Sequence, residues 1–145
     1  MISRDELRER LIAGGIPSHV IQIFDLDYEL PKPRWIQNEL AGAFRRFLFD
    51  AELVGRPEQF DCNKYAKLAS TMADLCWART RKSDAALAFG LAGVGLHMVN
   101  VAVHKDGVAF YEPQLQGEGV SGGVSMRRVE HTREDLRLCT VCLFV

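Results

Sequence analysis

The sequence predicts an α+β fold in which N-terminal helices pack on a C-terminal antiparallel sheet. Three observations lead to this prediction. Through the first half of the chain, apolar residues recur at the three-to-four-residue spacing of amphipathic helices. In the second half, runs rich in valine and aromatic residues alternate between two faces, and an Asp-Gly pair between two such runs is typical of a β-hairpin. Helices first and strands later favour the α+β class.

The length of 145 residues predicts a single domain, residues 1–145, because no repeat, linker or low-complexity tract divides the chain. Hydrophobic residues make up 48% of the chain and charged residues 26%, a balance that excludes a disordered chain. The 18 basic and 19 acidic side chains leave a net charge of -1 and no basic patch. We therefore expect no nucleic-acid partner.

Neither a membrane span nor a signal peptide is predicted. The longest mainly apolar stretch, Ala85–Val103, is broken by polar residues such as His97 and Asn100. Charged residues dominate positions 4–9, where a signal peptide needs an apolar region. We expect a cytoplasmic protein, and its four cysteines are then reduced thiols rather than a disulfide framework.

Two helices are predicted before residue 51. Ser3 and Glu6 have the spacing of a capping box, which opens a charged surface helix that runs to about Ile12 and stops at the glycine pair 14–15. The next helix spans Arg34–Phe49, after two prolines. Its buried stripe is predicted to contain Ile36, Leu40, Phe44, Phe47 and Leu48.

The third predicted helix begins at Cys62 and runs to about Arg79, with Asp61 well suited to be its N-cap. A thiol in the first turn of a helix lies near unpaired backbone amides and the positive end of the helix dipole, which both favour the thiolate. Cys62 is therefore the candidate nucleophile, and a cysteine that only packs in the core is the alternative. Cys76 is a second candidate, disfavoured by its position in mid-helix.

The sheet is predicted from the strands His97–His104 and Val108–Tyr111, which form the hairpin. A glycine-rich loop, Gly117–Gly123, leads to a turn near Thr132 and to a final apolar strand, Leu138–Val145. An imidazole at the beginning of a strand is commonly structural, and it is also what a general base needs. His97 is the candidate for that role.

The hairpin register decides which side chain lies beside His97. With a two-residue turn at residues 106–107, Gln114 is opposite Val99 and diagonal to His97. With a four-residue loop over residues 104–107, Gln114 is opposite His97 and Glu112 is the diagonal neighbour. Both registers keep Glu112 and Gln114 on the face of His97, whereas a three-residue loop would place them on the reverse face. The sequence leaves open which of the two would orient the imidazole.

Other residues with chemical potential are interpreted as structural. Cys139 and Cys142 have the gap of a zinc knuckle, but in a strand cysteines three apart point to opposite faces, and no second pair matches. We therefore expect no metal site. His104 beside the hairpin turn, and His19 and His131 in polar stretches, are expected to be solvated.

Three short blocks of the sequence resemble, in order, the cysteine, histidine and acidic blocks of papain-like cysteine hydrolases. They are Phe60-Asp61-Cys62 at a helix start, Gly95-Leu96-His97-Met98-Val99-Asn100-Val101 on a strand, and Phe110-Tyr111-Glu112-Pro113-Gln114 after a turn. Within these hydrolases, the chain resembles the papain-like domain of the Marasmius oreades agglutinin type and its small phage and bacterial relatives. The resemblance covers residues 27–114 and implies a papain-like fold with a nucleophile-bearing helix.

The resemblance also implies a catalytic triad of Cys62 as nucleophile, His97 as general base and later acid, and Glu112 as the group that orients His97. Gln114 would support the site, and Gln59 would be an oxyanion donor. The implied activity is hydrolysis of amide bonds in protein or peptide substrates through a thioester acyl-enzyme, as a peptidase or a protein amidase or deamidase, without a cofactor. The alternative is a catalytically silent papain-like module with a binding or structural role, as in a phage or toxin system.

Overall fold

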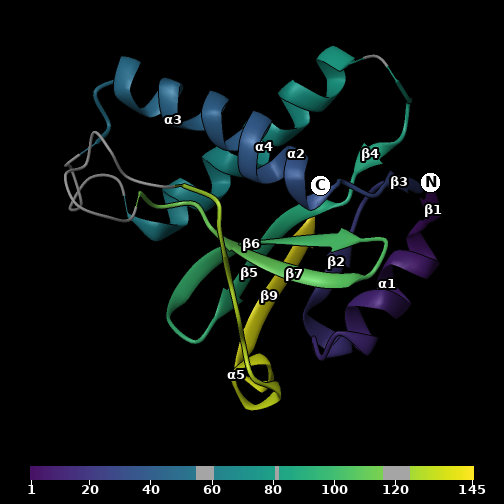
Figure 1. Ribbon diagram of the computed structural model, residues 1–145. Helices are drawn as coiled ribbons and strands as arrows, with labels where there is room; N and C mark the ends of the chain where they lie inside the picture. The colour runs from purple at the N-terminus through teal and green to yellow at the C-terminus, as the bar shows by residue number, and fades with distance from the viewer. Residues whose placement is uncertain (55–60, 81, 116–124) are drawn as a thin grey trace.

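A computed structural model describes residues 1–54, 61–80, 82–115 and 125–145 of the chain. Helices lie on both sides of a curved six-stranded sheet (Figure 1). The helical elements are α1 (Arg4–Ala13), the 3-10 turn η1 (Ser18–Val20), α2 (Pro33–Trp35), the π-helical turn η2 (Ile36–Leu40), α3 (Ala41–Asp50), α4 (Cys62–Thr80) and α5 (Arg133–Arg137). The strands are β1 (Ile2–Ser3), β2 (Ile21–Ile23), β3 (Asp27–Glu29), β4 (Ala86–Leu87), β5 (Phe89–Val94), β6 (His97–His104), β7 (Gly107–Glu112), β8 (Arg127–Val129) and β9 (Cys139–Phe144).

The main sheet has the strand order β2-β9-β5-β6-β7-β8. Its neighbouring strands are antiparallel except β2 and β9, which run parallel. A second sheet, in the order β1-β3-β4, is built from very short strands. The predicted α+β class is confirmed, although the N-terminal part also contributes strands to both sheets.

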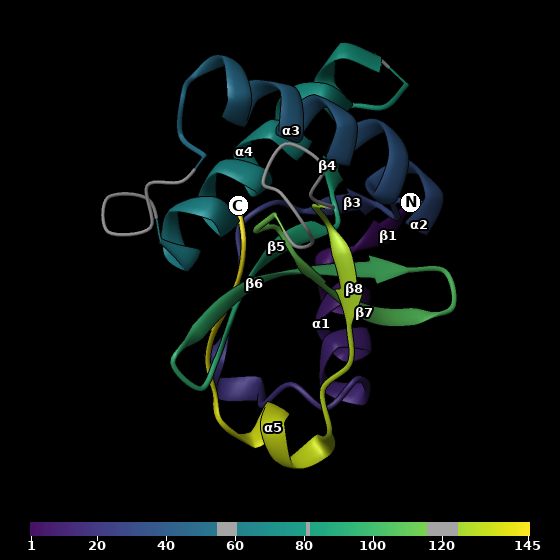
Figure 2. The same ribbon diagram turned by 60° about the vertical axis from the view of Figure 1, so that its left-hand side comes forward.

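The main sheet separates two hydrophobic cores because side chains alternate along each strand. On one face, α1 and α5 pack against Val99, Val101 and Val103 of β6. On the other face, η2, α3 and α4 pack against residues that include Phe89 and Ala102. The turned view in Figure 2 shows the same division, with α3 and α4 on one side of the sheet and α1 and α5 on the other.

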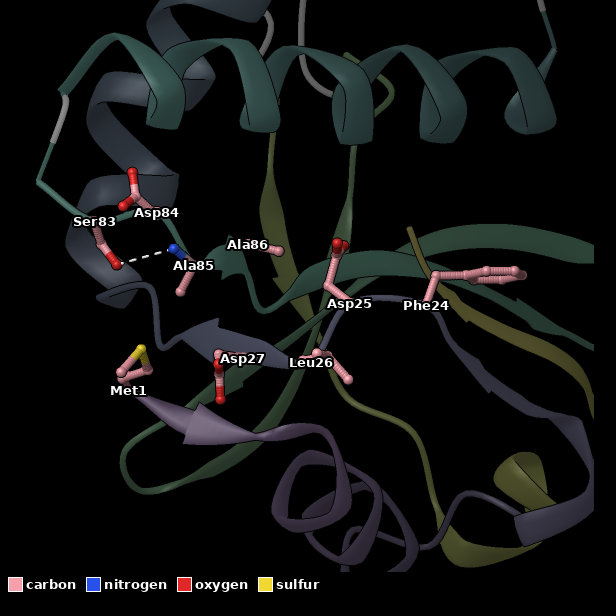
Figure 3. Close-up of a pocket in the computed structure, with 9 residues that line it drawn as sticks. All are labelled: Met1, Phe24, Asp25, Leu26, Asp27, Ser83, Asp84, Ala85 and Ala86. Carbon is pink, nitrogen blue, oxygen red and sulfur yellow. Dashed lines mark hydrogen bonds between the residues drawn. The ribbon is translucent and has the colours of Figure 1, made fainter.

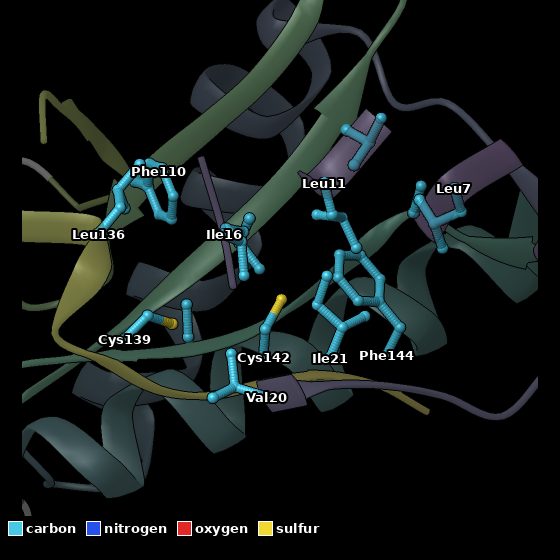
Figure 4. Close-up of a cluster of buried hydrophobic side chains, with 14 of the residues drawn as sticks. Leu7, Leu11, Ile16, Val20, Ile21, Phe110, Leu136, Cys139, Cys142 and Phe144 are labelled. Carbon is cyan, nitrogen blue, oxygen red and sulfur yellow. The ribbon is translucent and has the colours of Figure 1, made fainter. Parts of the chain in front are cut away.

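Cys139 and Cys142 both lie in the core beneath α1, with their sulfur atoms among apolar side chains (Figure 4). The prediction that they point to opposite faces is therefore wrong. The ladder between β5 and β9 shifts register between Gly93 and Val94, so one extra residue of β9 separates the two cysteines. The expectation that both pack in the core is confirmed, since they are 4% and 0% exposed.

The helices follow their sequence signals in part. Ser3 caps α1, its Oγ accepting a hydrogen bond from the amide of Glu6 at 3.2 Å. The single helix expected over Arg34–Phe49 is instead interrupted by the wide turn η2. Such a turn rotates the residues that follow it about the helix axis, and Phe47 is 44% exposed rather than buried with the rest of its stripe. No helix among the described residues is long and apolar enough to cross a bilayer.

The β6–β7 hairpin turns at Lys105 and Asp106, with His104 paired to Gly107 and Val103 to Val108. This is the register expected for the longer loop, although the turn itself has two residues. Continued to the strand ends, it places Gln114 opposite His97 and Glu112 opposite Val99. The histidine and the acidic residue therefore occupy the same end of neighbouring strands and share one face.

Candidate active site

Cys62 is the first residue of α4, as expected, and Asp61 caps the helix. The amide of Lys64 donates to Oδ1 of Asp61 at 3.5 Å, and the amide of Tyr65 donates to its backbone carbonyl at 3.0 Å. Cys62 is partly exposed, and its Sγ lies 3.7 Å from Oδ1 of the neighbouring Asn63. The thiol therefore has the helix-start position that favours a thiolate, in contact with solvent.

His97 and Glu112 form an ion pair in which Nε2 of the imidazole contacts Oε2 of the carboxylate. The histidine side chain is 45% exposed, whereas the glutamate side chain is 8% exposed. The other carboxylate oxygen, Oε1, accepts a hydrogen bond from the backbone amide of Gln114 at 3.1 Å. No hydrogen bond to a described residue occupies the other ring nitrogen of His97, Nδ1. The imidazole is thus held by one edge and open at the other.

Asn100 ties the beginning of α4 to the strand that carries His97. Its side-chain nitrogen donates to the carbonyl of Ala66 at 3.0 Å and to the carbonyl of Gly90 at 3.1 Å. Ala66 is about one helical turn from Cys62, and Asn100 is three residues, roughly 10 Å, from His97 along β6. Both ribbon views accordingly show the beginning of α4 on the same side of the molecule as the β5–β6 turn (Figures 1 and 2).

The structure does not, however, record a contact between Cys62 and His97. Along β6, Asn100 faces α4, whereas His97 has the parity of Val99 and faces the α1 side of the sheet. Among the described residues, the thiol contacts the side chain of Asn63 and the imidazole contacts Glu112. A direct Cys62–His97 pairing therefore requires the imidazole to turn toward α4 at the end of the strand, and that pairing stays a prediction.

The structure describes some of the remaining predicted site residues and not others. Gln114 contacts Glu112 only through its backbone amide. Gln59 and the Gly117–Gly123 loop lie outside the described residues. Burial raises the pKa of the Cys76 thiol, the alternative nucleophile, and so reduces its thiolate fraction at neutral pH.

The described residues contain no group of three histidine, cysteine or acidic side chains that is placed to hold a metal ion. Burial raises the pKa of both Cys139 and Cys142, which further disfavours the thiolate form that zinc needs.

The surroundings of His104 differ from the sequence prediction. It is 5% exposed, not solvated, and Nδ1 lies 2.6 Å from the carbonyl of Pro31 while Nε2 lies 2.8 Å from the hydroxyl of Tyr111. Nδ1–H therefore donates to the carbonyl, and Nε2 accepts from the hydroxyl. Burial lowers the pKa of this imidazole. The sequence signal that could have predicted this burial is the strand alternation, which places His104 on the same face as the buried residues Asn100 and Ala102.

Comparison with known proteins places the fold. No protein-family model matches the sequence, and no curated protein matches it. The solved structure described as the PSL1a–E64 complex superposes with a TM-score of 0.60 at 17% sequence identity, over 86% of this chain and 49% of that one. The chain thus spans about half the length of this structure. It has an α+β fold of the papain-like type, as the sequence predicted.

Proposed function

We propose that the chain is a cysteine hydrolase that acts on amide bonds of protein or peptide substrates. Cys62 is the nucleophile, His97 the general base and acid, and Glu112 the group that orients His97. The observation that carries the proposal is the contact between Nε2 of His97 and Oε2 of Glu112. It fixes one ring nitrogen as a donor to a carboxylate and leaves Nδ1 able to exchange a proton with a thiol.

The position of Cys62 supports the same assignment. At the first position of α4 its backbone amide has no partner within the helix, so it is available to an oxyanion. The bond from Asn100 to Ala66 fixes this first part of α4 against β6. The fold neighbour is described as a complex with E64, a papain inhibitor, which supports a reactive thiol in this architecture.

The proposed reaction proceeds in two steps. The Cys62 thiolate attacks the amide carbon, and the electron pair of the carbonyl moves to oxygen, where the Cys62 amide and, as proposed, Gln59 donate hydrogen bonds. As the carbonyl re-forms, the bond to nitrogen breaks, and imidazolium at His97 gives its proton to the leaving amine. His97 then takes a proton from water, which attacks the thioester and releases the acid and the thiolate. Glu112 stabilises the imidazolium form throughout.

The test is covalent labelling by E-64 at pH 6 to 7, followed by intact-mass and peptide mass spectrometry. The proposal predicts a single rapid adduct on Cys62. Cys62→Ser should abolish it, and His97→Ala should slow it by about 10² to 10⁴. Cys76→Ser is the matched control and should label at the rate of the parent.

Two outcomes would overturn the proposal. One is slow, unselective modification of several cysteines in the parent. The other is labelling of Cys62 that is unchanged in the His97→Ala variant. Peptidase action is then separated from deamidation by incubating the proteins that react with E-64 with glutamine-containing peptides and comparing the products. A mass increase of about 1 Da marks deamidation, and fragments mark peptidase action.

A second candidate function, a binding module without catalysis, is favoured by one observation. The recorded partner of the Cys62 thiol is Asn63, and His97 has the strand parity of the opposite sheet face. In that case the His97–Glu112 pair is a structural ion pair at the strand end. E-64 labelling distinguishes the two functions, because a binding module has no activated thiol.

A further inference from the structure

A groove on the molecule, separate from the candidate active site, runs between the segment 24–27 and the segment 83–86 (Figure 3). Its main cavity has a volume of about 580 Å³. A second cavity of about 320 Å³ shares the wall formed by residues 83–86 and extends to Asp74 and Trp77 of α4. Asp74 is twelve residues from Cys62, or roughly 18 Å along the helix axis. The second cavity therefore contacts the helix that carries Cys62, but far from the thiol.

The walls of the groove are negatively charged. Asp25, Asp27 and Asp84 line the main cavity, and Asp74 lines the second. No lysine or arginine is among the described residues that line either cavity, and none of the four carboxylates forms an ion pair with a described residue. The nearby amino group of Met1 is paired with Glu29 at 3.7 Å. The groove thus carries negative charge that no ion pair with a described residue neutralises.

The charge of Asp25 also acts on Asp74. Burial and, to a smaller degree, the charge of Asp25 raise the pKa of Asp74 to about 6. An ordinary aspartate would be neutralised only at more acidic pH. A cation placed in the groove would relieve this repulsion and favour the ionised form of Asp74. The electrostatic complement of the groove is therefore a positively charged group.

The rim of the groove is apolar. Phe24 is 64% exposed and Leu26 is 67% exposed, on the segment between β2 and β3. Figure 3 shows Phe24 and Leu26 on either side of Asp25, with Asp27 next to Leu26, and all four residues line the cavity. Large apolar side chains that lie exposed together commonly mark an interaction surface. A bare cation would leave them uncovered, so the complement must carry apolar groups as well.

We propose that this groove binds a segment of a partner polypeptide in which lysine or arginine residues alternate with apolar residues. The basic side chains lie among Asp25, Asp27, Asp74 and Asp84, and the apolar side chains cover Phe24 and Leu26. An extended peptide suits the site because it could follow residues 83–86, which line both cavities, and its alternate side chains project in opposite directions. The proposal concerns binding only and does not depend on the chemistry of Cys62.

The probe is a fluorescein-labelled heptapeptide of alternating lysine and leucine, with a glutamate–leucine heptapeptide as its counterpart. Fluorescence anisotropy with the whole chain should show binding of the lysine peptide that weakens at high salt, and no binding of the glutamate peptide. The double variant Asp25→Asn/Asp84→Asn should bind at least about five-fold more weakly, since two unpaired charges are removed. Phe24→Ser/Leu26→Ser should also weaken binding.

The matched control is Asp50→Asn/Asp106→Asn, which removes two exposed aspartates elsewhere and gives the same net charge. It should bind like the parent, and so should Cys62→Ala. A second readout is the carboxyl resonance of Asp74, whose pKa should fall when the lysine peptide is bound. Equal affinities of the two double aspartate variants, or an unchanged Asp74 titration with saturating peptide, would overturn the proposal. Loss of E-64 labelling in the active-site test would leave it unaffected.

Discussion

The side chain of Asn100 joins two carbonyl groups that are far apart in sequence, those of Ala66 in α4 and Gly90 in β5. Asn100 is wholly buried, and its own Oδ1 has no partner among the described residues. A buried amide oxygen without a hydrogen bond lowers the stability of the fold. We therefore infer that the two bonds donated by the Asn100 nitrogen compensate for this cost. They fix the beginning of α4, which carries Cys62, against the strand that carries His97.

We expect Asn100→Ala to lower the free energy of unfolding by about 2 kcal/mol. It removes two buried hydrogen bonds and leaves a small cavity beneath α4. Urea denaturation followed by circular dichroism measures the change. Asn38→Ala, at an exposed position of the π-helical turn, is the control and should change stability by no more than about 0.5 kcal/mol. A loss at Asn100 no larger than this control would contradict the anchoring role.

Two glycines should respond in opposite ways to alanine. A Cβ atom on Gly90 would lie 2.2 Å from the carbonyl oxygen of Leu143, because β5 and β9 approach closely there. We expect Gly90→Ala to cost about 3 kcal/mol or more, since backbone must move. A Cβ on Gly42 in α3 would meet nothing within 4 Å, so Gly42→Ala should stabilise the fold by about 0.5–1 kcal/mol. Thermal melting of both variants checks the pair, and equal effects would refute the close approach.

The residue that supports His97 can be identified with two variants. Glu112→Gln keeps the size of the side chain but removes its charge, and we expect it to slow E-64 labelling of Cys62 about 10-fold or more. Gln114→Ala keeps the backbone amide that contacts Glu112, so its labelling rate should match that of the parent. The reverse order of effects would assign the supporting role to the Gln114 side chain.

His104 should make stability depend on pH. Its pKa is lowered in the folded state by burial, so its contribution to stability is complete above the ordinary histidine pKa of about 6.5 and is lost as the pH falls through the lower, folded value. His104→Gln should therefore be less stable than the parent at pH 7.5, and this difference should shrink at pH 5. Urea midpoints at the two pH values give the measurement. His19→Gln, at an exposed site, should follow the parent, and a constant His104→Gln difference would contradict the prediction.

Asp74 should act with the opposite sign. Its side chain is exposed, but partial desolvation by the surrounding protein raises its pKa in the folded state to about 6, so ionisation costs stability between about pH 4 and pH 6 and the cost persists above pH 6. We expect Asp74→Asn to raise the free energy of unfolding at pH 7 by at most about 1 kcal/mol, because the site is open to solvent, and to have little effect at pH 4. Glu9→Gln is the exposed control. A stabilisation that is equal at both pH values would exclude this mechanism.

Local signals predicted much of the fold. The cap at Ser3 and the helix start at Cys62 depend on neighbouring residues, and both form as expected. The hairpin after His104 also forms, although its two-residue turn lies at residues 105–106 rather than at residues 106–107. The shared face of His97 and Glu112 was also predictable, since the two-residue turn and the four-residue loop both place them on one face. The choice of Glu112 over Gln114 as the contact of the imidazole was not, because it depends on side-chain rotamers at the strand ends.

Long-range relationships could not be read from local patterns. The parallel pairing of β2 with β9 joins residues more than a hundred positions apart, and β2 alone is three residues long. The bulge that brings Cys139 and Cys142 into one core is a property of the β5–β9 ladder rather than of the strand. The burial of His104 likewise depends on Pro31, from a distant segment. In each case a tertiary partner decides the outcome.

The place of β9 in the main sheet also bears on how the chain is made. It lies between β2 and β5, although it is the last of the described strands in sequence. During synthesis, β2 therefore emerges from the ribosome long before β9, and until then it lacks its strand partner. The nascent chain completes its sheet only when residues 139–144 become available, which makes maturation a late, cooperative event rather than a progressive one.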